Sequence, residues 1–139
     1  MPVVTKLINL RSKGELDIIN ITDEVAEAVK LSRLENGVAT IFVPGSTGGL
    51  TTIEYEPGLL KDFPAMLERI APKNLTYEHE KRWHDGNGHS HVRASLVGPS
   101  LAVPFVERKL TLGTWQQIVF IELDIHSRAR QLVVQIVGE

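Results

Sequence analysis

The 139-residue chain contains no cysteine, which excludes disulfide frameworks, thiolate metal sites and cysteine nucleophiles. Any metal site must therefore use His, Asp or Glu ligands. No apolar run reaches the roughly 18 residues that a membrane-spanning helix needs. The first residues also lack the basic-then-apolar plan of a secretory signal. These absences predict a cytoplasmic protein with no membrane partner.

The chain has no large excess of either charge. Fifteen Lys and Arg residues against seventeen Asp and Glu residues give a net charge of −2, which supplies no broad basic field for nucleic acid. Hydrophobic residues make up 42% and charged residues 23%, as in ordinary folded domains. We expect one domain over residues 1–139 and no nucleic-acid partner.

Hydrophobic periodicity predicts strands at both ends of the chain and helical segments between them. The strand candidates are residues 3–10, 16–21, 38–43, 50–55, 101–106, 110–112, 115–124 and 131–137. The first two are predicted to pair as a hairpin across the turn at 11–14, and the last four as an antiparallel meander. This order predicts an α+β fold built mainly on antiparallel sheet.

Two or three helices are expected. Thr22 or Asp23 can cap a first helix, which Asn36-Gly37 is predicted to end. A second helical pattern follows Pro57-Gly58, and Pro64 within it predicts a late start or two short pieces. The polar stretch 72–88 is predicted to be an ordered loop, and residues 91–96 a helical turn or a strand.

Four of the five histidines lie between residues 79 and 91, among carboxylate and amide side chains. Imidazole is the commonest neutral metal ligand, so this cluster indicates either a metal site or a solvated loop whose histidines merely lie close together. His89 and His91 would point the same way on an extended segment and diverge by about 200° on a helix. His84, His89 and His91 are the candidate ligands for a divalent cation, Zn or Mg.

A glycine-rich loop, Pro-Gly-Ser-Thr-Gly-Gly at residues 44–49, follows a strand predicted to be buried. Such a loop can present backbone N–H groups to an anion, and Ser46, Thr47 and Gly48 are the candidate phosphate-binding residues. The loop is neither a Walker motif nor Gly-x-Gly-x-x-Gly, since no Lys follows the glycines. The alternative is a tight connection that needs positive φ.

Other polar residues lie near these two segments. Arg93 would be the natural partner of a phosphate beside the histidines, where Ser95 and Ser100 add hydroxyl groups. Glu54 can serve as a base or a ligand, or remain a surface carboxylate. A Ser-His-Asp hydrolytic triad is not favoured, because the chain has no Gly-x-Ser-x-Gly elbow to place a nucleophile.

Near the carboxyl terminus, Trp115 and Gln116 begin an apolar segment. An aromatic residue at this place can pack against the sheet. An amide that enters an apolar strand needs a hydrogen-bonding partner, which makes Gln116 a candidate site residue.

Two long motifs in the carboxyl-terminal half point to a particular protein family. Residues 89–100, HSHVRASLVGPS, and residues 112–118, LGTWQQI, resemble the YjbQ family, also called uncharacterised protein family 0047. The resemblance continues through the terminal VQIVGE and upstream through ITDEV at 21–25 and FVP at 42–44, so it covers nearly the whole chain.

The resemblance implies an α+β subunit that assembles as a homotrimer, with a candidate site near subunit boundaries. It also implies a secondary thiamin phosphate synthase activity, which joins hydroxymethylpyrimidine diphosphate to thiazole phosphate and releases pyrophosphate. The positions of this chain that match the family pattern are His91, Ser95, Ser100, Thr114, Trp115, Gln116 and Glu54. On this basis His91, Glu54 and Gln116 are the candidate catalytic residues, and Thr114 and Trp115 join the ligand-binding set.

The chain departs from the family pattern in its first loop. Many members carry His-Thr-Thr where this chain has Gly45-Ser46-Thr47. If the missing histidine is a ligand or an acid elsewhere in the family, its role here is absent or transferred to His84 or His89.

Three function classes follow from these residues. The leading hypothesis is an enzyme acting on phosphorylated small molecules, in which Arg93, the amides of the loop 46–49 and a divalent cation neutralise a diphosphate leaving group. The first rival is a trimeric protein that binds a small ligand or a metal without turnover. The second is a metal-dependent hydrolase, which the cluster of His, Asp and Glu residues suggests.

Overall fold

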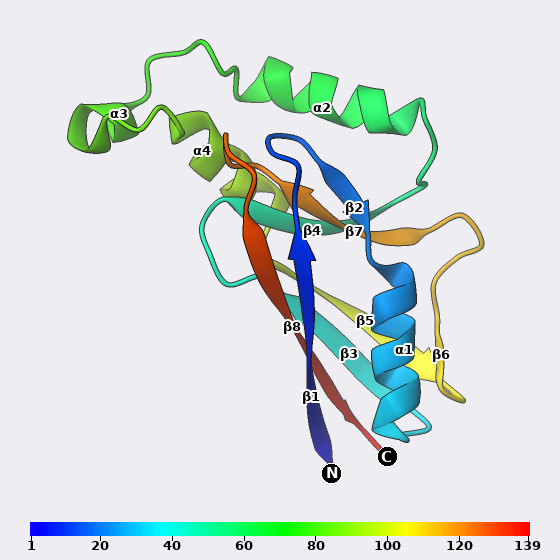
Figure 1. Ribbon diagram of the computed structural model, residues 1–139. Helices are drawn as coiled ribbons and strands as arrows, with labels where there is room; N and C mark the ends of the chain where they lie inside the picture. The colour runs from blue at the N-terminus through cyan, green and yellow to red at the C-terminus, as the bar shows by residue number, and fades with distance from the viewer.

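The computed structural model describes residues 1–139 as an α+β fold with two curled antiparallel sheets (Figure 1). The larger sheet has the strand order β1-β8-β3-β5-β6 and the smaller one β2-β7-β4. The strands are β1 (Val3–Arg11), β2 (Ile18–Asn20), β3 (Gly37–Phe42), β4 (Gly48–Ile53), β5 (Ser100–Val106), β6 (Lys109–Leu110), β7 (Gln117–Glu122) and β8 (Ala129–Gly138).

The predicted strands form, but two predicted pairings are wrong. β1 and β2 make no hairpin, because β1 pairs with β8 and β2 pairs with β7. The expected meander holds only between β5 and β6, since β7 belongs to the smaller sheet and β8 lies between β1 and β3. Pairing across the whole chain brings the two termini side by side, with Val3 opposite Val137.

The structure has four helices, where two or three were expected. They are α1 (Thr22–Ser32), α2 (Leu59–Ile70), α3 (Glu78–Trp83) and α4 (Gly88–Val97). The additional helix α3 lies in the stretch that was predicted to be a loop. The region around His91 is helical from Gly88 onward, and α2 continues through Pro64 as a single helix.

Helix α1 ends earlier than predicted. It stops at Ser32, where Arg33 adopts a left-handed conformation and its N–H donates to Lys30 O at 3.3 Å. Gly37 is therefore not the helix stop but the first residue of β3.

One apolar core lies between the larger sheet, α1 and part of the smaller sheet, and it includes Ile8, Val25, Ile41, Phe120 and Leu132. A second, smaller cluster packs under α2 and α4 around Leu67, Val119 and Leu123. Figure 1 shows α2, α3 and α4 at the same end of the molecule, beside the smaller sheet, and α1 on the larger sheet. This arrangement leaves the loop between β3 and β4 next to α4.

The other face of the larger sheet carries no helix. Its register aligns Val3, Val137, Val38 and Pro104 in one row and Leu7, Val133 and Phe42 in another, with Thr5, Gln135 and Thr40 between them. The Thr5 hydroxyl donates to Gln135 Oε1 at 2.7 Å. None of these three rows contains a charged residue, so the chain exposes a largely apolar sheet face.

Gly37 is required by close packing of the sheet. A Cβ at this position would lie 2.1 Å from Val137 O, which is far inside contact distance. We predict that Gly37→Ala lowers the free energy of unfolding by about 1–3 kcal/mol, as overpacked sites do. Urea unfolding of Gly113→Ala is the matched control, because a Cβ there meets its nearest atom at an ordinary 3.7 Å. Equal stability of the two variants would contradict the assigned register.

Candidate functional site

The loop between β3 and β4 is held by one of its own residues, Thr47. The Thr47 side chain is buried, and its hydroxyl donates to Asp124 Oδ2 at 3.1 Å. Arg130 Nη2 donates to the same hydroxyl at 3.0 Å and to Thr47 O at 3.3 Å. Leu123 N also donates to Thr47 O, at 3.0 Å. Thr47 was predicted to bind ligand, and the structure places it as the anchor beneath the loop.

Beneath Thr47 lies a buried ion pair between the two sheets. Arg130 of β8 donates from Nε to Glu122 Oε1 of β7 at 3.0 Å, and from Nη2 to Oε2. Glu122 is fully buried and also accepts from Ser12 Oγ at 2.7 Å. Both oxygens of this carboxylate therefore accept hydrogen bonds, which a buried charge requires. The third nitrogen of Arg130, Nη1, lies 3.1 Å from the position that a Cβ on Gly45 would occupy.

The top of the loop keeps free hydrogen-bond donors. The backbone N–H groups of Gly45, Ser46 and Thr47 donate to no acceptor within the chain. Gly45 has a φ of +125°, which L side chains rarely adopt, and a Cβ there would lie in tight contact with Arg130 Nη1 at 3.1 Å. Consecutive free N–H groups of this kind form an anion-binding arrangement, and the Arg130 guanidinium lies directly beneath them.

This loop and α4 enclose a cavity of about 180 Å³. It brings together Ser46, Gly48, His91 and Ser95, four of the residues that the sequence singled out. His91 extends from α4 and is partly exposed, while the Ser95 hydroxyl donates to His91 O at 2.9 Å along the helix. The cavity volume lies below the usual 300–1,000 Å³ range of small-molecule pockets, so one chain offers room for a phosphate or diphosphate group.

His91 is paired with a second histidine from α3. The ring centroids of His79 and His91 lie 4.3 Å apart. Burial of the His91 imidazole lowers its pKa below the ordinary value of 6.5, and the neighbouring charge of His79 lowers it further. Asp124, Asp85 and Glu80 oppose this shift without reversing it. His91 is therefore uncharged near pH 7 and can accept a proton.

The His79 ring contacts two polar side chains, Asp85 and Asn87. Its Nε2 lies 3.3 Å from Asp85 Oδ1 and 3.1 Å from the Asn87 amide. The other end of that amide lies 3.4 Å from Asp124 Oδ1. Although burial alone would raise the pKa of Asp124, the Ile125 N–H and the Arg128 guanidinium lower it overall. Asp124 is thus an ionised carboxylate that touches both the loop, through Thr47, and the segment that carries the histidines.

His89 and Arg93 point into a different cluster. His89 is buried, and its Nε2 lies 2.5 Å from Glu15 Oε1. Arg93, 1% exposed, donates to Ala71 O at 3.0 Å and to Glu68 Oε2 at 2.6 Å. The helix thus separates His89 from His91, and Arg93 lines no part of the cavity. Arg130 does not line the cavity either, but it lies beneath the loop, where it donates to Thr47 and Glu122.

The three histidines that were named as metal ligands do not come together. His84 is exposed, with a left-handed backbone at the end of α3, and His89 is engaged by Glu15. Nowhere in the chain do three or more His, Asp or Glu side chains form a metal-binding group. The residues present in one chain therefore do not fit a Zn or Mg site.

Three of the remaining candidates line another hollow. Glu54, Thr114 and Trp115 lie around a cavity of about 340 Å³, together with Asn20 and Gln117. Trp115 is 71% exposed, so the prediction that it packs against the sheet is wrong. Gln116 finds the partner that its amide needs: Nε2 donates to Thr52 Oγ1 at 3.0 Å. Ser100 is exposed at the start of β5.

Sequence reasoning missed His79, Asp124 and Arg130. Asp124 ends an apolar strand and Arg130 interrupts another, and buried charges at such places need partners. The sequence shows these two charged residues, but not that they lie together. They meet at the Thr47 hydroxyl because β7 and β8 belong to two different sheets that pack against each other there.

Comparison with known proteins decides the family. The model of the family described as UPF0047 protein YjbQ-like matches residues 6–139. A UPF0047 protein of Methanothermobacter thermautotrophicus is 37% identical over 139 residues, which is all of this chain and 95% of the relative. The protein belongs to the UPF0047 (YjbQ-like) family. UPF0047 protein YugU of Bacillus subtilis is 32% identical over 96% of this chain and 98% of its own.

Solved structures agree with this assignment to the UPF0047 family. A YbjQ-like protein of unknown function from Sulfolobus solfataricus superposes with a TM-score of 0.94 at 32% identity, covering 99% of each chain. A hypothetical protein from Aeropyrum pernix gives 0.90 at 28% identity, covering 98% of this chain and 99% of its own. These two proteins therefore share the α+β fold of this chain. No helix of this member is both long and apolar enough to cross a membrane.

The protonation state of the His91 ring can be measured directly. We predict that its ring titrates below pH 6.5 in an NMR titration, and that His79→Asn moves the midpoint upward, because the charge of His79 contributes to the depression. His84→Ala is the control, since His84 is exposed and outside the cavity. A midpoint at or above 6.5 in the wild-type protein would contradict the burial of this ring.

Proposed function

We propose that this UPF0047 protein is an enzyme that binds a phosphorylated small molecule, with the phosphate in the cavity at His91. The observation that carries the proposal is the set of free N–H groups at Gly45, Ser46 and Thr47, in a loop whose residues Gly45 and Ser46 line one cavity with His91 and which lies above the Arg130 guanidinium. These are the groups that bind and stabilise a phosphate or diphosphate.

The reaction that we propose joins hydroxymethylpyrimidine diphosphate and thiazole phosphate to give thiamin phosphate. The thiazole nitrogen uses its lone pair to form a bond to the pyrimidine methylene carbon. The bond from that carbon to the diphosphate oxygen breaks, and its electrons leave with pyrophosphate. The loop N–H groups and Arg130 stabilise the charge that develops on the leaving group.

His91 has a defined task in this scheme. As a neutral imidazole it donates one N–H to a phosphate oxygen, and the approach of a dianion raises its pKa. Burial, and after it the charge of His79, keeps the pKa of the free imidazole below its ordinary value, so the ring is uncharged until the phosphate binds. The scheme is written with the residues of one chain, which form no metal-ligand group.

The size of the cavity limits what one chain can hold. About 180 Å³ accommodates the diphosphate, whereas the two heterocycles need further room. The cavity of about 340 Å³ beside Trp115 and Glu54 offers an aromatic face and a carboxylate without an intrachain partner. We propose that an assembly of several copies completes the site.

The exposed face of the larger sheet supports such an assembly. Val38, Phe42, Val3 and Leu7 remain 40–54% exposed on it, and an exposed, largely apolar sheet face of this kind favours an interface. We propose that this face contributes to a homotrimer.

The activity has a direct assay. Purified protein is incubated with the two thiamin precursors, and thiamin phosphate and pyrophosphate are quantified. We expect product with the wild-type protein and a rate at least about tenfold lower for His91→Ala, within the range that acid–base and hydrogen-bonding groups contribute. His84→Ala should keep the wild-type rate, because it removes an exposed histidine outside the cavity.

One result would reject the enzyme proposal, and a second measurement would then identify the non-catalytic alternative. Absence of product with any preparation of folded wild-type protein rejects the thiamin phosphate synthase activity. If pyrophosphate nevertheless raises the melting temperature of the wild-type protein but not of His91→Ala, the cavity binds an anion without turnover, as the non-catalytic alternative requires.

The assembly is tested by light scattering. We predict a mass of three chains for the wild-type protein and of one chain for Phe42→Lys, because a buried charge without a partner opposes association. Leu75→Lys introduces the same charge at an exposed leucine outside the sheet and should stay trimeric. A wild-type mass of one chain, or a trimer that survives Phe42→Lys, would contradict the proposed interface.

A further inference from the structure

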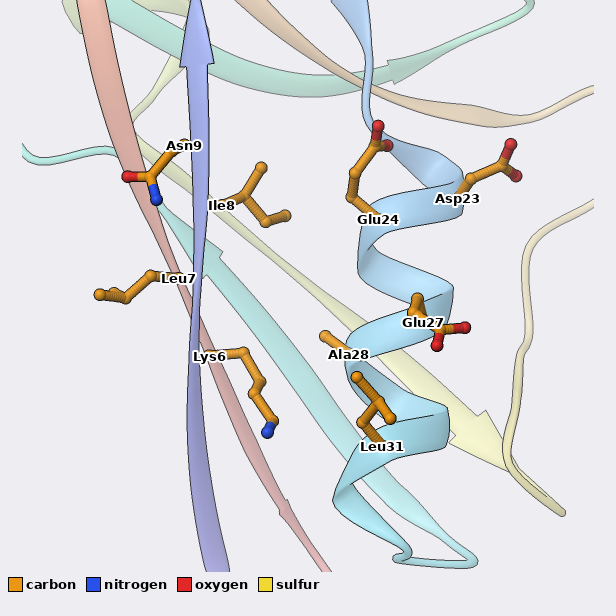
Figure 2. Close-up of a pocket in the computed structure, with 9 residues that line it drawn as sticks. All are labelled: Lys6, Leu7, Ile8, Asn9, Asp23, Glu24, Glu27, Ala28 and Leu31. Atoms are coloured by element: carbon orange, nitrogen blue, oxygen red, sulfur yellow. The ribbon is translucent and has the colours of Figure 1, made fainter.

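The largest hollow of the chain is a groove between α1 and β1, with a volume of about 580 Å³. Figure 2 shows Lys6 and Ile8 on the side of β1 that faces α1, where Glu24, Glu27 and Leu31 lie along the helix. The groove shares no residue with the cavity at His91, and the proposed reaction does not use it.

One wall of the groove is an open sheet edge. β1 has a single neighbour, β8. Ser12 N donates to Arg128 O at 2.9 Å, and Gly138 N donates to Pro2 O at 3.4 Å, so even-numbered positions face β8 in this register. Because antiparallel ladders alternate, the odd positions Thr5, Leu7 and Asn9 direct their N–H and C=O groups to the open edge.

The opposite wall is acidic. Asp23, Glu24 and Glu27 of α1 line the groove with a single cation, Lys6, which gives the lining a net charge of 1 − 3 = −2. None of these four side chains forms an ion pair or a hydrogen bond within the chain, although many other charges of the protein are paired. The carboxylates therefore remain available to cations from outside.

The floor of the groove is apolar. Ile8 and Ala28 are buried at its base, and Leu31 stays 57% exposed at its rim. Long basic side chains suit such a groove, since their aliphatic stems cover apolar surface while the charged ends reach carboxylates. The groove thus combines an open edge strand, an apolar floor and an acidic wall.

We propose that this groove binds an extended segment of a partner protein, in which lysine or arginine alternates with apolar residues. The segment adds to β1 as a further strand and pairs with Leu7 and Asn9. Its basic side chains face α1 and meet Glu24 and Glu27, while its apolar side chains continue the outer sheet face beside Leu7. A free linear polycation would neutralise the carboxylates but would leave the edge N–H groups without partners, so charge and edge together favour the peptide.

Amide hydrogen exchange of the full chain tests this pairing. The probe is the peptide acetyl-Lys-Val-Lys-Val-Lys-Val-amide. We expect it to slow exchange at Thr5, Leu7 and Asn9, which point to the open edge. Exchange at Lys6 and Ile8 should not change, because their N–H groups already face β8. The same peptide with N-methyl groups on its valines cannot pair fully and should give no protection.

A charge-neutralising pair of variants tests the acidic wall. Glu27→Gln should weaken binding of the peptide about two- to fivefold, which corresponds to the usual contribution of one exposed ion pair. Glu107→Gln, which removes an exposed carboxylate on the β5–β6 turn, should leave the affinity unchanged.

Several outcomes would overturn the proposal. The first is that millimolar peptide does not slow amide exchange at the open edge of β1. The second is that the N-methylated peptide or spermine slows this exchange as much as the probe does. The third is that Glu27→Gln binds the peptide as tightly as the wild-type protein. Edge protection that rises with protein concentration without peptide would assign the groove to a second copy of this chain instead. Failure of this proposal is distinguishable from failure of the thiamin phosphate assay, because the groove shares no residue with the cavity at His91.

Discussion

The buried ion pair between Arg130 and Glu122 is the interaction on which the site depends. It links β8 of the larger sheet to β7 of the smaller one and holds Thr47 at the point where the chain passes from β3 to β4. Removing one partner of such a pair leaves a buried charge unsatisfied, at a cost of about 3–5 kcal/mol. The loop above it is therefore fixed by the same contacts that join the sheets.

Asp124 extends this constraint to the histidines. Its carboxylate accepts from Thr47 beneath the loop and from Arg128, and it lies beside the Asn87 amide that contacts His79. One buried carboxylate thus contacts the loop directly and connects through Asn87 and His79 to the His91 ring, although loop and ring come from segments more than forty residues apart. Rigid placement of this kind is what binding and stabilising a diphosphate demands.

Local sequence patterns predicted most of the strands, the first helix and the α+β class, because the periodicity of apolar residues is set by local geometry. The partners of β1, β2, β7 and β8 were not predictable in this way, since pairing across more than a hundred residues leaves no local signal. For the site, Ser46, Gly48, His91 and Ser95 were predicted and do share a cavity. Sequence proximity to the histidines points to Arg93 as the phosphate partner, but the helix turns Arg93 toward Glu68 instead.

The central claim is that the loop and His91 form a single anion site above the buried ion cluster. The most direct measurement is an NMR titration of the wild-type protein with pyrophosphate. The account predicts that the amides of Gly45, Ser46 and Thr47 and the ring of His91 shift together with one dissociation constant, while the Trp115 indole does not move. Shifts at Trp115 alone, or a loop and a His91 ring that respond with different affinities, would contradict it.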